Sequence, residues 1–360
     1  MNRPSLARTG LTAALATLAL ALTACGGGST TAAAPSTSAP AAGTSSAVPA
    51  AGPRGPLTLD QCTGEKLDRK VTYDAVPQRI FTLDPQSAEF LIALGVGDRI
   101  VGTWGQYPDD VMKTLPQYAE QLKKIKSYDD GKTWPPPIEV IASTKPDIVV
   151  TTYRLNIPNY LDATRLKKDA GIDAYSFTSY CNGEVMRTFD PLFKDIANLG
   201  QIFDVAPAAD ALVTTMKGQL DEAAALTAGK PRAKVWQYAG EEVPYPVGGT
   251  GIPNAIMYLA GADNVFEDVK EVYGEVSWEQ VVQRNADVIW LQTDAGPGFV
   301  QTQDGLTKAV AAHKGLGGVT GVAKKRYVVV PYTTAGTLSV HNAEAVLEFA
   351  KKLQEVTAAG

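Results

Sequence analysis

Two carboxylates with the same spacing occur twice in the sequence. Glu139 and Asp147 lie in IEVIASTKPDIVVTTY, and Glu279 and Asp287 occupy the matching positions of WEQVVQRNADVIWLQT. Paired carboxylates can carry out general acid–base chemistry, but an acidic residue in a first helical turn is also favoured by the helix dipole alone. In each segment an amphipathic stretch follows the Glu and an apolar run follows the Asp. The repeat predicts two similar lobes built from one βα unit, and a cleft between such lobes is a common ligand site.

Aromatic side chains gather in the loops that follow the predicted strands. In an open parallel sheet, ligands bind at the carboxyl ends of the strands. Aromatic faces with hydroxyl tips suit a large, flat or partly apolar ligand, although core packing is the alternative for each single ring. Arg154 could pair with an anionic chelate or be a solvated loop residue. The candidate ligand-binding residues are Trp104, Tyr107, Tyr128, Tyr153, Arg154, Tyr238, Tyr245 and Tyr332.

The chain lacks the sequence patterns of common enzyme and metal sites. No G-x-G-x-x-G motif follows the first predicted strand, and neither a Walker loop nor a His–carboxylate pair ends a strand. The two histidines, His313 and His341, are too few for the several ligands that a bare-metal site needs. The GGTG stretch at 248–251 is expected only to let a loop turn. We therefore expect a protein that is not an enzyme, with no catalytic residue, metal site or resident cofactor.

The first residues resemble a lipoprotein signal. Arg3 and Arg8 precede a short apolar run, and the stretch LTAC ends at Cys25. This pattern predicts a signal peptide over 1–24 and a lipid-modified Cys25, the alternative being an ordinary signal peptide with a chance cysteine. Residues 25–56 are rich in Gly, Ser, Thr, Ala and Pro, a composition typical of a flexible linker. The expected location is the extracytoplasmic face of the cell membrane, with the lipid as the membrane anchor.

The remaining sequence predicts an α/β fold with two Rossmann-like lobes. The apolar runs RIFTLD, RIVGTW, DIVVTT and AYSFTS alternate with helical stretches, and KVWQYA, DVIWLQ and RYVVVPY repeat the alternation further along. Such alternation indicates βα units and mostly parallel sheets. An Ala-rich stretch with helical periodicity predicts one long, stiff connecting helix, and hence little hinge motion. The expected divisions are an N-terminal lobe over 57–205, the connecting helix over 206–230 and a C-terminal lobe over 231–360.

The cysteine content predicts a disulfide within the chain, and the net charge argues against one class of partner. Cys62 and Cys181 form an even pair in an oxidising compartment, which favours a disulfide over two free buried thiols. The formal net charge of −5 argues against nucleic acid as a partner. We expect a monomer.

The body from about residue 75 resembles the periplasmic-binding-protein family for iron–siderophore complexes and vitamin B12. The motifs that carry the resemblance are VPQRIFTLDPQSAEFLIALGVGDRIVGT, PPPIEVIASTKPDIVV, NAIMYLAGADNVF and VSWEQVVQRNADVIWL. The resemblance implies a substrate-binding subunit of an ABC importer, whose lobes are joined by one long helix. It also implies that Glu139 and Glu279, one on each lobe, dock onto arginines of the permease, since exposed carboxylates can steer and register a basic partner. Glu89 is a weaker candidate for that surface, or a purely structural helix residue.

The expected ligand follows from the resemblance together with the aromatic loops. An iron–siderophore complex, delivered to an ABC permease and its ATPase, is the favoured ligand. Cobalamin and haem are alternatives, because mainly apolar and aromatic walls would also suit them. A ligand-sensing lipoprotein without transport is a further alternative.

Overall fold

The computed structural model describes residues 55–63, 66–114, 116–179, 181, 183–294 and 302–358. The predicted signal peptide, the lipidation site Cys25 and nearly all of the predicted linker lie outside these residues. None of the helices within the described ranges is long and apolar enough to cross a membrane.

The first of two parallel sheets has the strand order β4-β3-β5-β6. Its strands are short and mostly buried, which explains why the sequence shows them as continuous apolar runs rather than as alternating patterns. The strands are β3 (Ile80–Thr82), β4 (Ile100–Thr103), β5 (Ile148–Thr151) and β6 (Asp173–Ser176). The helices around it are α1 (Pro85–Ala93), α2 (Asp109–Thr114), α3 (Pro116–Leu122), α4 (Ile138–Ser143), α5 (Ala163–Ala170) and α6 (Asp190–Ile202), with a short 3-10 helix at Gly97–Arg99.

The second parallel sheet has the strand order β10-β9-β7-β8. In each parallel sheet, the strand that comes first in the sequence pairs with the strand that carries the repeated segment: β3 with β5, and β7 with β9. The strands are β7 (Ala233–Tyr238), β8 (Ala262–Asn264), β9 (Val288–Leu291) and β10 (Tyr327–Val329). The helices are α8 (Ile252–Leu259), α9 (Trp278–Arg284), α10 (Gln303–Ala312), α11 (Thr320–Ala323), α12 (Tyr332–Ala335) and α13 (Asn342–Ala358), with a 3-10 helix at Leu316–Gly318.

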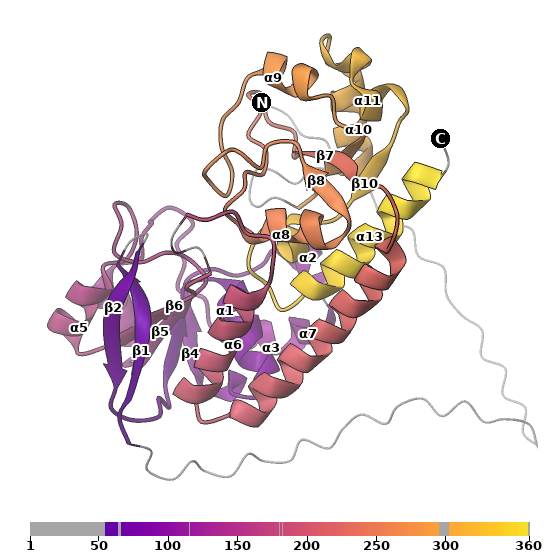
Figure 1. Ribbon diagram of the computed structural model, residues 1–360. Coiled ribbons are helices and arrows are strands. Elements are labelled where there is room, and N and C mark those ends of the chain that lie inside the picture. Colours follow the sequence, from indigo (N-terminus) through magenta and orange to yellow (C-terminus); the bar gives the residue numbers. More distant parts are fainter. Residues whose placement is uncertain are drawn as a thin grey trace, which may run out of the picture. The chain divides into compact units, whose positions relative to one another are not determined.

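Helix α7 (Ala206–Thr227) lies between the two sheets in the sequence, where the composition predicts a long helix. Its buried residues Ala209, Met216 and Ala223 recur every seven positions and so share one face. This face allows α7 to pack against α6 and α13, and Figure 1 shows α13 running beside α7. A Cβ on Gly200 of α6 would lie 2.6 Å from the Ala209 Cβ, so glycine is required where α6 and α7 meet.

An antiparallel hairpin of β1 (Leu57–Thr63) and β2 (Lys66–Tyr73) precedes the first sheet, and the sequence did not predict it. The hairpin is tied to β6, because Gln61 accepts a hydrogen bond from the Ser176 backbone N–H at 3.2 Å and the Tyr73 hydroxyl donates to the Ala174 carbonyl at 3.0 Å. Cys62 on β1 also meets Cys181 after β6, with their sulfur atoms in contact and their Cα atoms 6.3 Å apart. That Cα separation suits a disulfide, and the pairing itself stays a prediction.

The repeated Asp has the same structural role in both lobes. Asp147, just before β5, accepts hydrogen bonds from the backbone N–H groups of Gln78 and Arg79 at 2.7 and 2.9 Å. Asp287, just before β9, accepts one from the backbone N–H of Lys234 at 3.0 Å. Each carboxylate therefore fastens the beginning of its strand to the beginning of the neighbouring strand. The Asp of the repeat belongs to the fold rather than to a catalytic pair.

Candidate functional site

A cavity of about 460 Å³ takes its lining from both lobes. The N-terminal lobe contributes the loop after β5, and the C-terminal lobe contributes Tyr245, the segment before α9 and the region of α12. The lining residues are Thr152, Tyr153, Arg154, Ile157, Tyr160, Tyr245, Lys270, Glu271, Val272, Tyr273, Tyr332, Gly336 and Thr337. Four of the predicted ligand-binding residues, Tyr153, Arg154, Tyr245 and Tyr332, are thus brought together.

Asp84 fixes the end of β5, from which the cavity loop emerges. Its carboxylate is fully buried and accepts hydrogen bonds from Ser87 N–H at 2.7 Å, from the Thr151 hydroxyl at 2.8 Å, and from the Thr152 N–H and hydroxyl, both at 3.0 Å. Burial raises the pKa of Asp84, and these hydrogen bonds oppose the rise. Because Asp84 also caps α1, one side chain joins the start of that helix to the backbone that leads into Tyr153.

Aromatic rings form the walls of the cavity. On the N-terminal lobe, the lining residues Tyr153 and Tyr160 both pack against the ring of Trp134, which is not itself a lining residue, with centroids 5.3 and 6.0 Å away and the rings nearly perpendicular. On the C-terminal lobe, Tyr245 stacks on Tyr273 with 6.4 Å between their centroids. Trp134 and Tyr245 remain 41% and 46% exposed, so both rings are accessible from solvent.

The sequence did not point to Trp134, Tyr160 or Tyr273. Trp134 precedes a helix instead of following a strand, so the rule that selects strand ends passes over it. Tyr160 and Tyr273 lie well beyond the strands that come before them. A search for aromatic residues in every long loop, rather than only at strand ends, would have found all three.

The other four predicted aromatic residues lie in packed surroundings and are not among the lining residues. The Trp104 indole donates to the Thr133 carbonyl at 3.2 Å, and the Tyr107 hydroxyl donates to Glu89 at 3.1 Å. Tyr128 packs against Phe81, and Tyr238 packs against Trp236 and Trp278. Trp104, Tyr107 and Tyr238 are 4%, 7% and 5% exposed, so the structure shows them supporting the loops, and direct ligand contact by them stays a prediction.

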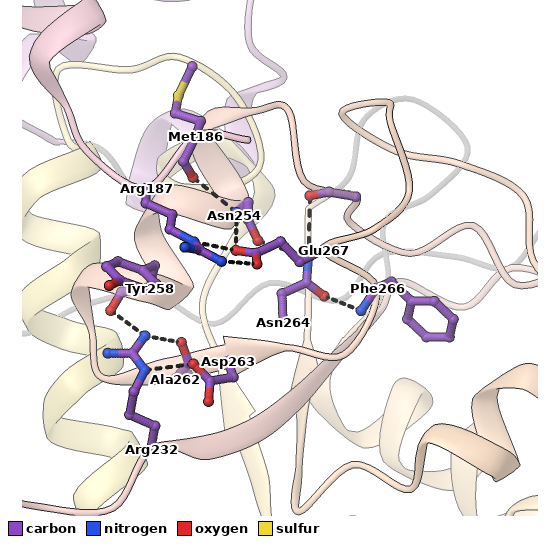
Figure 2. A network of polar contacts seen from close by, with 11 residues as sticks. Met186, Arg187, Arg232, Asn254, Tyr258, Ala262, Asp263, Asn264, Phe266 and Glu267 are labelled. Atoms are coloured by element: carbon purple, nitrogen blue, oxygen red, sulfur yellow. Dashed lines mark hydrogen bonds and ion pairs between the residues drawn. The ribbon is translucent and has the colours of Figure 1, made fainter. Parts of the chain in front are cut away.

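The C-terminal wall of the cavity is held by a polar network that reaches the N-terminal lobe (Figure 2). Arg187, between β6 and α6, forms a two-point ion pair with Glu267, with Nε 2.9 Å from Oε1. Asn254 donates to both the Met186 carbonyl and Glu267, at 2.9 and 3.2 Å. Glu267 begins the segment that supplies Lys270 to the lining, so the network positions that wall.

The GGTG stretch does more than form a turn: its backbone lies in close contact with the segment that lines the cavity. A Cβ on Gly249 would lie 2.2 Å from the Glu267 carbonyl oxygen, and one on Gly248 would lie 2.3 Å from the Glu271 carbonyl oxygen. The backbone N–H groups of Gly248 and Gly249 donate to the carbonyls of Val272 and Val269. Glycine is therefore required because the cavity segment lies directly against this backbone.

Glu139 and Glu279 occupy equivalent exposed positions in the first turns of α4 and α9. A hydrogen bond with the Ser277 side chain lowers the pKa of Glu279. Both carboxylates face solvent, as docking would require. Glu89 differs, because it is completely buried on α1, and this favours the structural alternative for that residue.

The described ranges contain no group of three or more His, Cys, Asp or Glu side chains arranged to hold a metal ion. His341 is 7% exposed and faces Glu89 instead of lining the cavity.

Comparison with known proteins places the chain among proteins that bind substrates for transport. The sequence pattern of the family described as periplasmic binding protein matches residues 80–331. An uncharacterized ABC transporter substrate-binding lipoprotein of Bacillus subtilis, YvrC, is 25% identical over 265 residues, which cover 72% of this chain and 77% of the relative. A vitamin B12-binding protein of Vibrio campbellii is 23% identical over 218 residues, which cover 61% of this chain and 72% of the relative.

Solved structures show the same fold. The structure of an ABC-type Fe3+-hydroxamate transport system from Saccharomonospora viridis aligns with a TM-score of 0.65 at 23% identity, covering 84% of this chain and 98% of that chain. The two parallel-sheet lobes are therefore the architecture of known binding proteins. The curated relatives above are named as binding proteins, not as enzymes.

Proposed function

Because the chain belongs to the periplasmic-binding-protein family, we propose that it is the extracytoplasmic substrate-binding lipoprotein of an ABC importer. It captures an iron–siderophore complex in the cavity lined by both lobes and delivers this ligand to a permease and its ATPase. Cys25 carries the lipid that holds the protein at the membrane, and Cys62 pairs with Cys181 to tie the hairpin to the N-terminal lobe.

The observation that carries the ligand proposal is the composition of the cavity. Five tyrosines, Tyr153, Tyr160, Tyr245, Tyr273 and Tyr332, line about 460 Å³ together with Arg154. Aromatic faces can pack against the organic part of a chelate, while hydroxyl groups bond to its oxygen atoms. The volume falls within the range of sites for small-molecule and cofactor ligands.

Cobalamin is a second candidate ligand, favoured by the vitamin B12-binding relatives. A corrinoid would also use aromatic and apolar walls. Haem is a third possibility and rests on the same walls.

A ligand panel tests the proposal. The protein is titrated with ferric hydroxamate, ferric catecholate, haem and cobalamin, while tryptophan fluorescence is followed and bound complexes are weighed by native mass spectrometry. We expect a fluorescence change and a mass shift with a ferric siderophore, because Trp134 lies against two lining tyrosines. Binding of cobalamin or haem alone would replace the siderophore proposal. No response to any member of the panel would refute the proposed ligand class.

A further inference from the structure

Two short antiparallel segments connect the cavity wall to the start of helix α9. Residues 244–248 lie against residues 272–276, and we call them the paired segments. Val247 and Tyr273 form an antiparallel bridge at their centre. The backbone hydrogen bonds between them run from the N–H groups of Gly248, Gly274 and Val276 to the carbonyls of Val272, Pro246 and Pro244, at 2.9, 3.1 and 3.0 Å.

The paired segments carry two cavity rings and lead directly into α9. Tyr245 and Tyr273 both line the cavity, and their rings stack on each other. The second segment ends at Val276, and the next residue, Ser277, caps α9 with its side chain. The exposed carboxylate of Glu279 lies in the first turn of that helix, only six positions after Tyr273. A lining ring and a candidate docking residue are therefore close neighbours in the chain.

Trp278 gives α9 a second attachment to the cavity wall. The covalent connection through Ser277 alone would let the helix turn about the two soft backbone bonds of that residue. The Trp278 indole prevents this, because its Nε1–H donates to the Glu242 carbonyl at 3.2 Å and its ring packs against Tyr238 at 6.4 Å. Glu242 comes three positions before Tyr245. The loop that carries a lining ring thus also orients the helix.

The pairing of these segments is of a kind that opens locally. The paired segments belong to no helix or sheet strand, and Val243 and Tyr245 are 50% and 46% exposed. Backbone pairing of this kind, beside exposed side chains, opens more readily than the elements of a core. A ligand that packs on Tyr245 and Tyr273 opposes such opening, because the segments must release the ligand before they separate.

We propose that ligand binding in the cavity orders the start of α9, and that Trp278 is the positioning residue that transmits this effect. The inference rests on the proposed function of the cavity. It gives the permease a way to distinguish the loaded protein, since Glu279 is held in one orientation once Tyr245 and Tyr273 are covered. A carboxylate that is already held loses less conformational entropy when it pairs with a basic partner.

Amide hydrogen exchange tests the proposal on the full chain. Exchange is followed at single residues by mass spectrometry, with and without a ferric hydroxamate complex at about 100 times its dissociation constant. Openings that must release the ligand then become up to about a hundredfold rarer. We expect at least about tenfold slower exchange at Val276, in the paired segments, and at Val281, whose N–H bonds to the Ser277 carbonyl in α9. Leu306, whose N–H bonds to the Thr302 carbonyl in the first turn of α10, should exchange at an unchanged rate.

Two tryptophan variants show whether Trp278 transmits the effect. Trp278→Phe keeps a ring but removes the Nε1–H donor, so the dissociation constant should stay within about twofold and the slowing at Val276 should persist. The slowing at Val281 should shrink by about fivefold, the effect of one hydrogen bond. Trp290→Phe is the matched control, because the Trp290 indole donates to the Val330 carbonyl at 2.9 Å in the same lobe. It should keep the slowing at both amides.

The outcomes separate this inference from the proposed function. If the ligand binds but exchange at Val281 is unchanged in the wild type, or if Trp278→Phe and Trp290→Phe behave alike, the coupling is refuted while the binding role stands. If the ferric hydroxamate does not bind, cobalamin takes its place in the same measurement. If no ligand of the panel binds, the proposed function fails and the coupling fails with it.

Discussion

His341 and Glu89 are both buried, and their side chains face each other. His341 follows the lining residue Thr337 by four positions, and its Nε2 lies 3.6 Å from Oε1 of Glu89. The other ring nitrogen lies 3.5 Å from Glu344, the Tyr118 ring packs at 5.9 Å, and the Tyr107 hydroxyl bonds to the second oxygen of Glu89. At 3.6 Å the contact is a charge interaction rather than a hydrogen bond. It links α1 to the turn that begins α13.

We predict that this contact makes stability depend on pH. Burial alone lowers the pKa of His341, but Glu89, with help from Glu344, outweighs it, so that the pKa lies above its ordinary value. The stabilisation is therefore complete below the ordinary pKa and is lost as pH rises through the raised one. Urea unfolding at about pH 6 and about pH 8 should show the wild type losing stability with rising pH, and His341→Gln losing less.

The control for this prediction changes the other histidine. His313→Gln should keep the pH dependence of the wild type, since His313 contacts Trp278 rather than Glu89. Equal pH dependence in the wild type and in His341→Gln would show that the contact with Glu89 contributes nothing.

At the scale of elements, one wall of the cavity is held in place by residues that are far from it in the sequence. The wall that contains Lys270 and Glu271 belongs to no helix or strand, and it is held by the Gly248–Gly249 backbone and by Glu267. Arg187, from the N-terminal lobe, in turn pairs with Glu267. The geometry of one lobe's cavity wall thus depends on a residue of the other lobe.

Arg187→Met should weaken ligand binding. The Arg187 side chain is 51% exposed, so solvent screens its pair with Glu267, and the dissociation constant of the ferric siderophore should rise only about threefold. Calorimetric titration measures the change.

Arg232→Met is the matched control for Arg187→Met. Both guanidinium groups lie over the Tyr258 ring, at 5.2 Å for Arg187 and 4.2 Å for Arg232, but Arg232 bonds to Asp263 and to carbonyls of its own lobe (Figure 2). Arg232→Met should lower stability without weakening binding. Equal losses of affinity in the two variants would mean that the pair with Glu267 has no special role in positioning the wall.

The sequence predicts elements better than it predicts these connections. Apolar runs identified the buried strands, and helical periodicity identified α7, because both signals are local. Tyr153 and Arg154, which the sequence places just after β5, do line the cavity, and ligand contact by them stays a prediction. The hairpin of β1 and β2 was missed because its strands carry many polar and charged residues and are defined by pairing with each other and by contacts with β6. The wall at Lys270 was missed because its path is set by contacts distant in sequence.

At the scale of the whole molecule, the repeated unit serves two purposes. Its Asp fastens neighbouring strands in each lobe, and its Glu is exposed at the start of a helix in each lobe. The helix dipole accounts for an acidic residue at either position, but not for the same arrangement on both lobes. An importer subunit has to present both lobes to its permease, and one carboxylate on each lobe would register both at once.

Reversing both charges should separate docking from ligand binding. The double variant Glu139→Arg/Glu279→Arg should bind the ferric chelate as the wild type does but abolish uptake of labelled iron by cells. Asp304→Arg reverses another exposed acidic residue in a first helical turn, outside the repeated unit, and should preserve uptake. Loss of ligand affinity in the double variant would contradict the docking role of Glu139 and Glu279.

The position of iron in a crystal of the protein with a bound ferric siderophore tests the central claim most directly. Anomalous scattering at the iron edge should give one peak in the cavity, with Tyr153, Arg154, Tyr245 and Tyr332 around the chelate. The account would be contradicted by an iron peak elsewhere, for example in a separate cavity of about 450 Å³ beside Cys181, Met186 and Lys194.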